Sequence, residues 1–296
     1  MSKARRRFRF PRLAPAAAVL AALAIGLQAL GPATAPSRTG PDVRAGSCQA
    51  GLADAAARNA ASLHSLAFAP FGRPETGWEI YAPLVGHEIG TGCEAGSPAF
   101  ARDLAAWQGA HGLGGGGVLD EATFAAMKAL WQARRPFVAA SRQACPAPPD
   151  ETSLAVVPAD QSYGGKAMLL RPAALAAYGR LLAAARAQAP AVRADRRLMT
   201  LFSAWRSPAY DAARCARDGN CQGVVRASCS PHRTGLAIDL DLGAAPGFGP
   251  DSSDDANRLF ITRGAAYRWM VANAGRLGFV NYAFEPWHWE WTGEAI

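Results

Sequence analysis

The sequence has no Cys-x-x-Cys motif and, outside its first residues, little excess of charge of either sign. The missing motif argues against a zinc ribbon and a thioredoxin-like redox site. The net charge is +8, of which residues 1–12 contribute +6, so the remainder carries only +2. A remainder this close to neutral does not support a nucleic-acid-binding surface. Charged residues make up only 18% and hydrophobic residues 50%, which excludes a disordered chain.

Residues 1–35 have the features of an export segment. A basic start without acidic residues is followed by an apolar run at residues 13–30, as in secretory signals. The small residues at 33–35 resemble a cleavage site, but Pro36 directly after them hinders cleavage, and the apolar run is about long enough to span a bilayer. A cleaved signal peptide and a retained membrane anchor therefore both fit. Either one predicts a periplasmic or other extracytoplasmic protein, exported or anchored in the inner membrane.

Six cysteines fit an oxidising compartment. They lie at Cys48, Cys93, Cys145, Cys215, Cys221 and Cys229. Six cysteines allow 15 pairings, and the sequence does not choose among them. If all six pair and a domain boundary follows Cys145, three cysteines fall on each side of it. At least one disulfide must then cross that boundary.

The 296 residues suffice for one large or two small domains. Shifts in Pro, Gly and polar content divide the chain after residue 35. The predicted segments are a linker at 36–77 with one possible helix at 52–68, a small all-helical domain at 78–140, a Pro-rich linker at 141–155 and a second domain at 156–296.

Two helices are predicted within residues 78–140. Ser97 followed by Pro98 is typical of a helix start, and Asp120 is a candidate N-cap for the second helix. Between the helices lie four glycines at 114–117, but no Gly-Lys-Ser/Thr follows them, which excludes a phosphate-binding loop.

A Trp-Gln pair late in each helix completes a pattern that resembles the peptidoglycan-binding domain of many cell-wall hydrolases. The matching positions are Trp107, Gln108, Gly112, Leu113, Leu119, Asp120, Thr123, Trp131 and Gln132. The resemblance implies a wall-binding role for this region. The helical spacing alone also fits a generic helical hairpin.

The second domain mixes helical and strand patterns. Residues 171–189 and 261–279 have helical spacing, whereas residues 197–205, 235–243 and 285–291 have strand character, the last two with alternating side chains. This mixture predicts an α+β fold with a small antiparallel sheet flanked by helices.

Two of the five histidines lie in or just before those alternating stretches, His288 within 285–291 and His232 three residues before 235–243. His232, Asp239 and His288 supply two imidazoles and one carboxylate, which is a zinc-binding set with one position left for water. Gly235 allows a sharp turn between His232 and the strand that carries Asp239. Glu285 precedes His288 by three residues and is a candidate base beside such a site. By spacing alone, these residues also fit a purely structural arrangement.

The motifs around these residues narrow the choice. They read SPHRTGLAID at 230–239 and EPWH at 285–288. In this order they resemble the VanY-type zinc D-alanyl-D-alanine carboxypeptidases of the LAS-fold peptidases, over about residues 161–293. The resemblance implies one zinc ion per chain, held by His232, Asp239 and His288, and a catalytic base at Glu285.

Two further residues match this family. Arg206 matches an arginine that holds the scissile carbonyl or the substrate carboxylate, which suits a planar, permanently charged guanidinium. Ser230 matches a serine that positions the substrate or a ligand. The chain departs from the family at Asp211, where Gln is usual, at residues 204–205, and in a cysteine-containing insertion before Ser230. We expect these departures to lie at the rim of the peptide site, so they leave the identity of the scissile bond open.

Asp241 and Glu290 follow the proposed ligands on the same strands. They could orient those ligands, or they could simply face solvent.

The resemblance implies a zinc-dependent D,D-carboxypeptidase that hydrolyses the terminal D-Ala-D-Ala bond of peptidoglycan stem peptides. One alternative is an endopeptidase of the same fold that cuts a crosslink or the L-Ala-D-Glu bond. Another is a non-catalytic cell-wall-binding protein. The sequence identifies no oligomeric partner.

Overall fold

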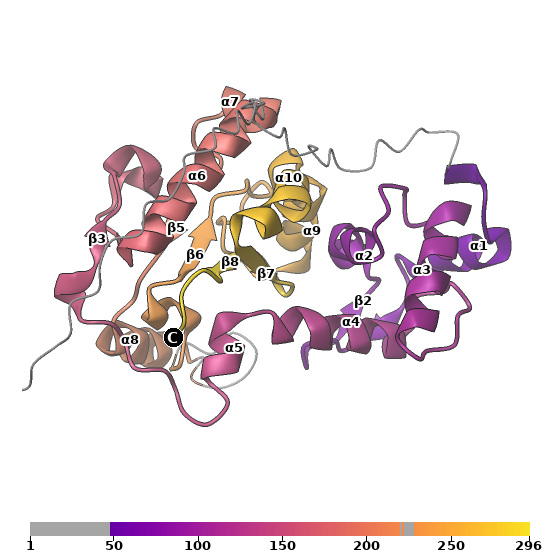
Figure 1. Ribbon diagram of the computed structural model, residues 1–296, viewed down its shortest axis with the longest axis horizontal. Coiled ribbons are helices and arrows are strands. Elements are labelled where there is room, and N and C mark those ends of the chain that lie inside the picture. The colour runs from indigo at the N-terminus through magenta and orange to yellow at the C-terminus, as the bar shows by residue number, and fades with distance from the viewer. Residues whose placement is uncertain (1–47, 220, 222–227) are drawn as a thin grey trace, which may run out of the picture. The chain divides into compact units, whose positions relative to one another are not determined.

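The computed structural model describes residues 48–219, 221 and 228–296 (Figure 1). The predicted signal or anchor segment at 1–35 lies outside these residues. Within the described part of the chain, no helix is both long and apolar enough to cross a membrane. All described residues belong to one compact unit, residues 40–296.

The first part of this unit is helical. Its elements are α1 (Ala53–Ser62), the short strand pair β1 (Ala67–Phe68) and β2 (Glu75–Thr76), the 3-10 helix η2 (Glu79–Tyr81), α2 (Ala82–Glu88), α3 (Pro98–Ala110), α4 (Glu121–Ala133) and α5 (Pro136–Ala140). The side chain of Ser97 caps α3 by accepting a hydrogen bond from the Phe100 N–H. Asp120 caps α4 in the same way through the Thr123 N–H. Both predicted helix starts are confirmed.

The described part of the predicted linker, residues 48–77, is folded onto this helical region. Asn59 of α1 is buried. Its side-chain Nδ2 donates to the Gly117 carbonyl, and its side-chain Oδ1 accepts from the Leu119 N–H. These bonds fix the end of the glycine-rich loop. Of the possible helix at 52–68, residues 53–62 form α1, whereas residues 67–68 form strand β1 instead. α1 supports the α3–α4 connection.

A second group of elements follows residue 150. They are the 3-10 helices η3 (Glu151–Ser153), η4 (Ala159–Gln161) and η5 (Tyr163–Gly165), the strand pair β3 (Ala155–Val156) and β4 (Leu169–Leu170), α6 (Pro172–Gln188), α7 (Pro190–Ala194), β5 (Leu201–Ser203), α8 (Pro208–Asp218), η6 (Pro231–Thr234), β6 (Ala237–Leu240), α9 (Asp255–Arg263), α10 (Ala265–Asn273), η7 (Ala274–Leu277), β7 (Phe279–Tyr282) and β8 (Glu285–Trp291). The predicted helix at 261–279 is divided, because Gly264 takes an extended conformation that ends α9 and precedes α10.

Four strands form one antiparallel sheet in the order β5-β6-β8-β7. The α+β prediction with a small antiparallel sheet agrees with this arrangement. α6 runs alongside the sheet (Figure 1), and its Pro in the first turn and its many Ala and Leu residues favour a helix there. One sheet face packs Ile238, Phe279, Trp289 and Trp291 into the main apolar core with α6 and α10.

The register of β6 and β8 places polar residues on the other face. Asp239 lies directly opposite His288, and Ala237 lies opposite Glu290. Because successive side chains of a strand point to opposite faces, Asp239, His288 and Glu290 share this face. All three are buried. The strands therefore bury both of their faces.

Three disulfides are present, Cys48–Cys93, Cys145–Cys229 and Cys215–Cys221. The prediction that at least one bridge crosses the boundary after Cys145 is confirmed by the second of them. Three disulfides and no free cysteine in the described residues fit an oxidising, extracytoplasmic compartment.

The helical region and the sheet region share an apolar cluster. Trp78, Tyr81, Phe100 and Phe124 pack with Phe284, which lies between β7 and β8. The division into domains at 78–140 and 156–296 remains a prediction, but the contacts across it are extensive.

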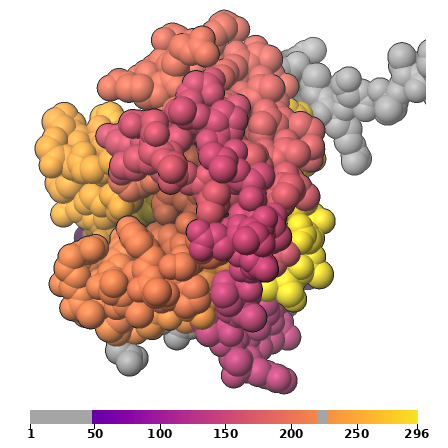
Figure 2. Space-filling view, turned by 90° about the vertical axis from the view of Figure 1, so that its left-hand side faces the viewer, coloured from indigo at the N-terminus to yellow at the C-terminus, as the bar shows by residue number. Residues whose placement is uncertain are grey.

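On the face shown in Figure 2, the surface is hollowed where segments coloured magenta, orange and gold meet.

Candidate metal centre

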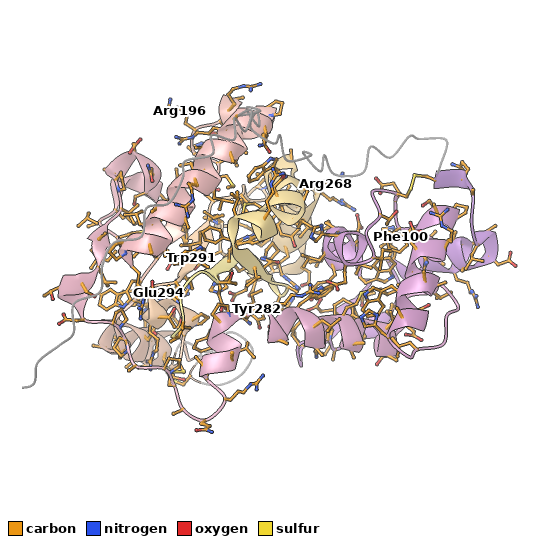
Figure 3. All side chains as sticks on the ribbon, viewed as in Figure 1. Phe100, Arg196, Arg268, Tyr282, Trp291 and Glu294 are labelled. Atoms are coloured by element: carbon orange, nitrogen blue, oxygen red, sulfur yellow. A yellow bond between two sulfur atoms is a disulfide. The ribbon has the colours of Figure 1, made fainter. Side chains whose placement is uncertain are left out.

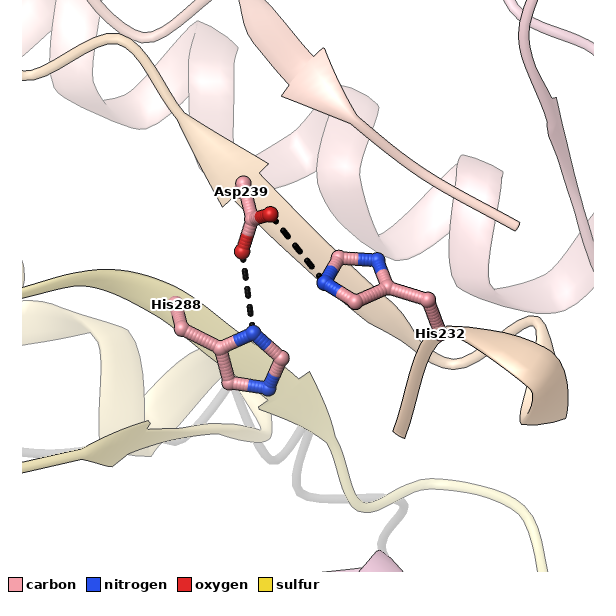
Figure 4. Close-up of side chains that lie close together, drawn as sticks. All are labelled: His232, Asp239 and His288. Atoms are coloured by element: carbon pink, nitrogen blue, oxygen red, sulfur yellow. Dashed lines mark hydrogen bonds and ion pairs between the residues drawn. The ribbon is translucent and has the colours of Figure 1, made fainter. Parts of the chain in front are cut away.

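Three elements bring the predicted ligands together. His232 lies on η6, Asp239 on β6 and His288 on β8 (Figure 4). Gly235 ends η6 with φ +72°, a left-handed conformation that glycine adopts without a Cβ clash, and the chain then turns into β6. The cross-strand register places Asp239 beside His288, and the turn at Gly235 returns His232 to the same face.

The three side chains form a closely spaced set. His232 Nε2 is 3.1 Å from Asp239 Oδ2, and His288 Nδ1 is 2.9 Å from Asp239 Oδ1. One donor atom from each residue lies within 4.8 Å of the others. All three residues are at most 6% exposed. The structure therefore brings together all three of the predicted ligands.

The hydrogen bond at the far side of His232 defines which nitrogen faces the site. His232 Nδ1 lies 2.7 Å from the Ala204 carbonyl oxygen, which can only accept, so Nδ1 carries the proton. In a neutral imidazole, Nε2 then presents a lone pair to the carboxylate of Asp239. A cation between these two atoms removes their repulsion. The donor set of two nitrogens and one oxygen suits zinc.

Burial and mutual contacts shift the pKa values of all three residues. Burial, followed by the nearby Arg206, lowers the pKa of His232 to about 4. Burial alone would raise the pKa of Asp239, but His232 and His288 hold it well below its ordinary value. Burial opposes the charged form of His288, yet its contacts with Asp239 and Glu290 prevail and raise its pKa to about 9.

Glu285 begins β8 next to this set. Its Oε2 lies 3.9 Å from His288 Nδ1, and its side chain is 14% exposed. Burial raises the pKa of Glu285. A carboxylate with a raised pKa binds a proton more readily than an exposed one, which suits a group that accepts and returns a proton.

Arg206 lies just before α8 and is held from three sides. Its Nη1 donates to Ser203 Oγ at 3.2 Å, its Nη2 donates to Ser230 Oγ at 2.7 Å, and its Nε lies 3.2 Å from Asp211 Oδ1. Asp211 is fully buried beside Arg206, so the expectation that residue 211 lies at the rim of a peptide site is wrong.

Ser230 links Arg206 to the His232 turn. Its hydroxyl also accepts from the His232 N–H at 3.2 Å, which caps η6. Ser230 is buried. Its observed contacts hold the ligand loop and the arginine, and a direct contact with substrate remains a prediction.

Glu290 and Asp241, the two acidic residues that could orient the ligands or face solvent, differ in their surroundings. Glu290 is 1% exposed, and its Oε1 lies 3.5 Å from His288 Nε2. Asp241 is also buried, but its carboxylate accepts from the Gly243 N–H and supports the following loop. Neither is a solvated strand residue, and Glu290 is the one that faces a proposed ligand.

Arg135 is the residue near this site that the sequence did not indicate. It lies between α4 and α5, and its Nε donates to Glu290 Oε1 at 2.7 Å. It is 155 residues away from Glu290 in the sequence. An Arg-Pro pair after a helix carries no signal for such a contact, so only the tertiary fold could reveal it.

Comparisons with known proteins give limited similarity. No protein-family model and no curated protein matches the chain. Among solved structures, the LdcB LD-carboxypeptidase, described with its peptidoglycan recognition, is 20% identical with a TM-score of 0.37, covering 50% of this chain and 72% of its own. A mutant of the VanY D,D-pentapeptidase from a VanB-type resistance cassette, in complex with Zn(II), is 19% identical with a TM-score of 0.30, covering 51% and 85%. DacB from Streptococcus pneumoniae D39 is 17% identical with a TM-score of 0.28, covering 50% and 86%. At TM-scores this low we base the function on the site's own residues.

Proposed function

We propose that the protein is a zinc-dependent D,D-carboxypeptidase that hydrolyses the terminal D-Ala-D-Ala bond of peptidoglycan stem peptides outside the cytoplasm. The observation that carries this proposal is the convergence of His232, Asp239 and His288 with Glu285 beside them. The motifs around these residues support the choice of substrate.

The three converging residues would hold the zinc ion, His232 through Nε2 and His288 through Nδ1, since these atoms face Asp239. When bound, zinc supplies a Lewis acid for the peptide carbonyl and the attacking water. His232 Nε2 and Asp239 Oδ2 face each other with a lone pair on each atom and no proton between them. This arrangement supports a cation at this position.

Glu285 acts as the general base and then as the general acid. It accepts a proton from the attacking water as the bond from oxygen to the carbonyl carbon forms. It then delivers that proton to the departing amine as the C–N bond breaks. Burial raises the pKa of Glu285, which favours its holding the proton between these two steps.

Arg206 holds the substrate. Its guanidinium is fixed by Ser203, Ser230 and the buried Asp211, so it is oriented before substrate binds. A fixed guanidinium can bind the terminal carboxylate or stabilise the developing oxyanion. The helical region with its peptidoglycan-binding-like pattern would raise the local substrate concentration by tethering the enzyme to the wall.

Digestion of purified muropeptides tests the proposal. We expect the zinc-loaded protein to release free D-alanine from pentapeptide stems, a chelator to abolish release and added zinc to restore it. Cleavage of crosslinked dimers into monomers, or of the L-Ala-D-Glu bond, without free D-alanine would instead indicate an endopeptidase. Binding of muropeptides without any product would indicate a wall-binding protein.

A further inference from the structure

We propose that Arg135 is a positioning residue of the metal site, which acts by holding Glu290 against the imidazole of His288. This inference rests on the proposed zinc site. It gives the helical region a part in the chemistry in addition to any role in wall binding.

The first step is the contact between Glu290 and His288. The two residues lie on the same face of β8, and Glu290 Oε1 is 3.5 Å from His288 Nε2. On the opposite edge of the ring, Nδ1 is 2.9 Å from Asp239. A histidine that binds metal through Nδ1 must carry its proton on Nε2. Nε2 is buried and makes no hydrogen bond in the structure, and Glu290 Oε1 is the carboxylate oxygen that lies at this edge of the ring. We infer that Glu290 accepts the Nε2 proton when metal is bound at Nδ1, which would select this tautomer and orient the ring.

The second step is that Glu290 is itself fixed by the segment between α4 and α5. Its Oε1 accepts from Arg135 Nε at 2.7 Å, and its Oε2 accepts from the Phe137 N–H at 3.0 Å. Arg135 Nη1 donates to Gln132 Oε1 at 2.8 Å, which holds the guanidinium in place. Both carboxylate oxygens of Glu290 are therefore bound by residues of the helical region.

An aromatic side chain adds a second contact between Arg135 and His288. The Arg135 guanidinium carbon lies 4.1 Å from the centre of the Tyr282 ring. The Tyr282 ring in turn packs edge-on against His288, with ring centres 6.1 Å apart. Tyr282 lies close to the α4–α5 segment (Figure 3). Arg135 is thus connected to His288 indirectly, through the Glu290 carboxylate and through the Tyr282 ring.

The neighbouring Arg134 provides a matched comparison. It pairs with Glu88, but its side chain is 50% exposed, whereas that of Arg135 is 5% exposed. Burying an arginine and a carboxylate together costs desolvation that a surface pair avoids. The fully buried pair of Arg135 and Glu290 lies at the proposed metal site, whereas the pair formed by the half-exposed Arg134 does not.

The test measures zinc affinity in the full chain by competition with a chromogenic chelator, and the Co(II) absorption spectrum as a report on ligand geometry. We expect Arg135→Met and Glu290→Gln to weaken zinc binding by about 10- to 100-fold and to alter the Co(II) spectrum. Arg135→Lys, which retains the charge, should recover part of the affinity. Arg134→Met should leave both readouts unchanged.

A double variant separates positioning from general destabilisation. If Arg135 acts through Glu290, Arg135→Met combined with Glu290→Gln should bind zinc no more weakly than the weaker single variant. A lowered unfolding temperature with unchanged zinc affinity in Arg135→Met would make Arg135 merely structural and overturn the inference. If Arg135→Met does not fold, unchanged affinity in both Arg135→Lys and Glu290→Gln overturns it instead. A wild-type chain that binds no zinc overturns the proposed function as well, whereas unaffected variants of a zinc-binding chain overturn this inference alone.

Discussion

Strands β6 and β8 present two faces that are equally buried but make different demands on their surroundings. On one face, Ile238 and Trp289 oppose each other within the apolar core. On the other, Asp239 opposes His288. Apolar burial is favourable by itself, about 1.5–3 kcal/mol for a large side chain. Burial of charged groups is unfavourable unless each has a partner. The apolar face can therefore stabilise the sheet, whereas the polar face depends on partners that residues outside the sheet provide.

The largest expected effect separates activity from stability on the polar face. Glu285→Gln removes the proposed base but retains the size of the side chain and the three ligands. We expect kcat to fall by about 10²- to 10⁴-fold, with zinc content and unfolding temperature close to those of the wild type. Assays of D-alanine release, zinc content by mass spectrometry and thermal unfolding check this. Full activity in this variant would exclude Glu285 as the base.

The apolar face should show the opposite separation. Ile238→Ala removes a buried side chain next to Asp239 but on the other face, and we expect it to cost about 2–5 kcal/mol in the free energy of unfolding. The zinc affinity of the folded molecule should stay unchanged, because the ligands keep their register. Urea denaturation and chelator competition measure the two quantities. A loss of zinc affinity as large as that expected for Glu290→Gln would show that the two faces are not independent.

The sequence predicted the parts of this comparison that depend on local pattern. The caps at Ser97 and Asp120 and the alternation in β6 and β8 follow from adjacent residues. The grouping of His232 with Asp239 and His288 came from two motifs, and the register of the strands brings them together.

The supporting contacts could not be predicted in the same way. The Ala204 carbonyl that fixes the His232 tautomer and the Arg135 side chain that holds Glu290 come from distant segments. A backbone carbonyl has no sequence signature, and Arg135 has an ordinary helix-end context. The sequence predicts Asp211 at a substrate rim, whereas the packing of α8 buries it against Arg206. Such contacts require the tertiary fold.

The polar face should also respond to pH in zinc binding. The pKa of His288 is raised to about 9, so below this pH its proton must be displaced when metal binds, and above it no proton competes. We expect zinc affinity to rise by about tenfold per pH unit between about pH 6 and 8.5, for one displaced proton. Competition titrations in a chelator-buffered series measure this slope.

The matched control for this slope is His64→Gln. His64 pairs with Glu79, but its side chain is 62% exposed and it lies outside the three proposed ligands. The slope should be the same in this variant as in the wild type. A pH-independent zinc affinity in the wild-type chain would contradict the assignment of His288 as a ligand.

The smallest effect is expected at the other end of β8, where a second polar cluster lies. Arg258 Nε donates to the Phe284 carbonyl just before Glu285, and Arg258 Nη2 donates to the Tyr81 hydroxyl at 2.6 Å. The same hydroxyl donates to Glu75 at 2.7 Å. This cluster joins the helical region to β8 without touching the three ligands. Tyr81→Phe removes one hydroxyl from it.

We expect Tyr81→Phe to lower the free energy of unfolding by about 1–2 kcal/mol, because Arg258 and Glu75 each lose a buried partner. Zinc affinity should be unchanged, in contrast to Arg135→Met at the far end of the strand. Urea denaturation and chelator competition on the same sample compare the two ends directly. If Tyr81→Phe weakens zinc binding as much as Arg135→Met does, contact with the helical region anywhere along β8 would suffice to hold His288, and the specific path through Glu290 would be lost.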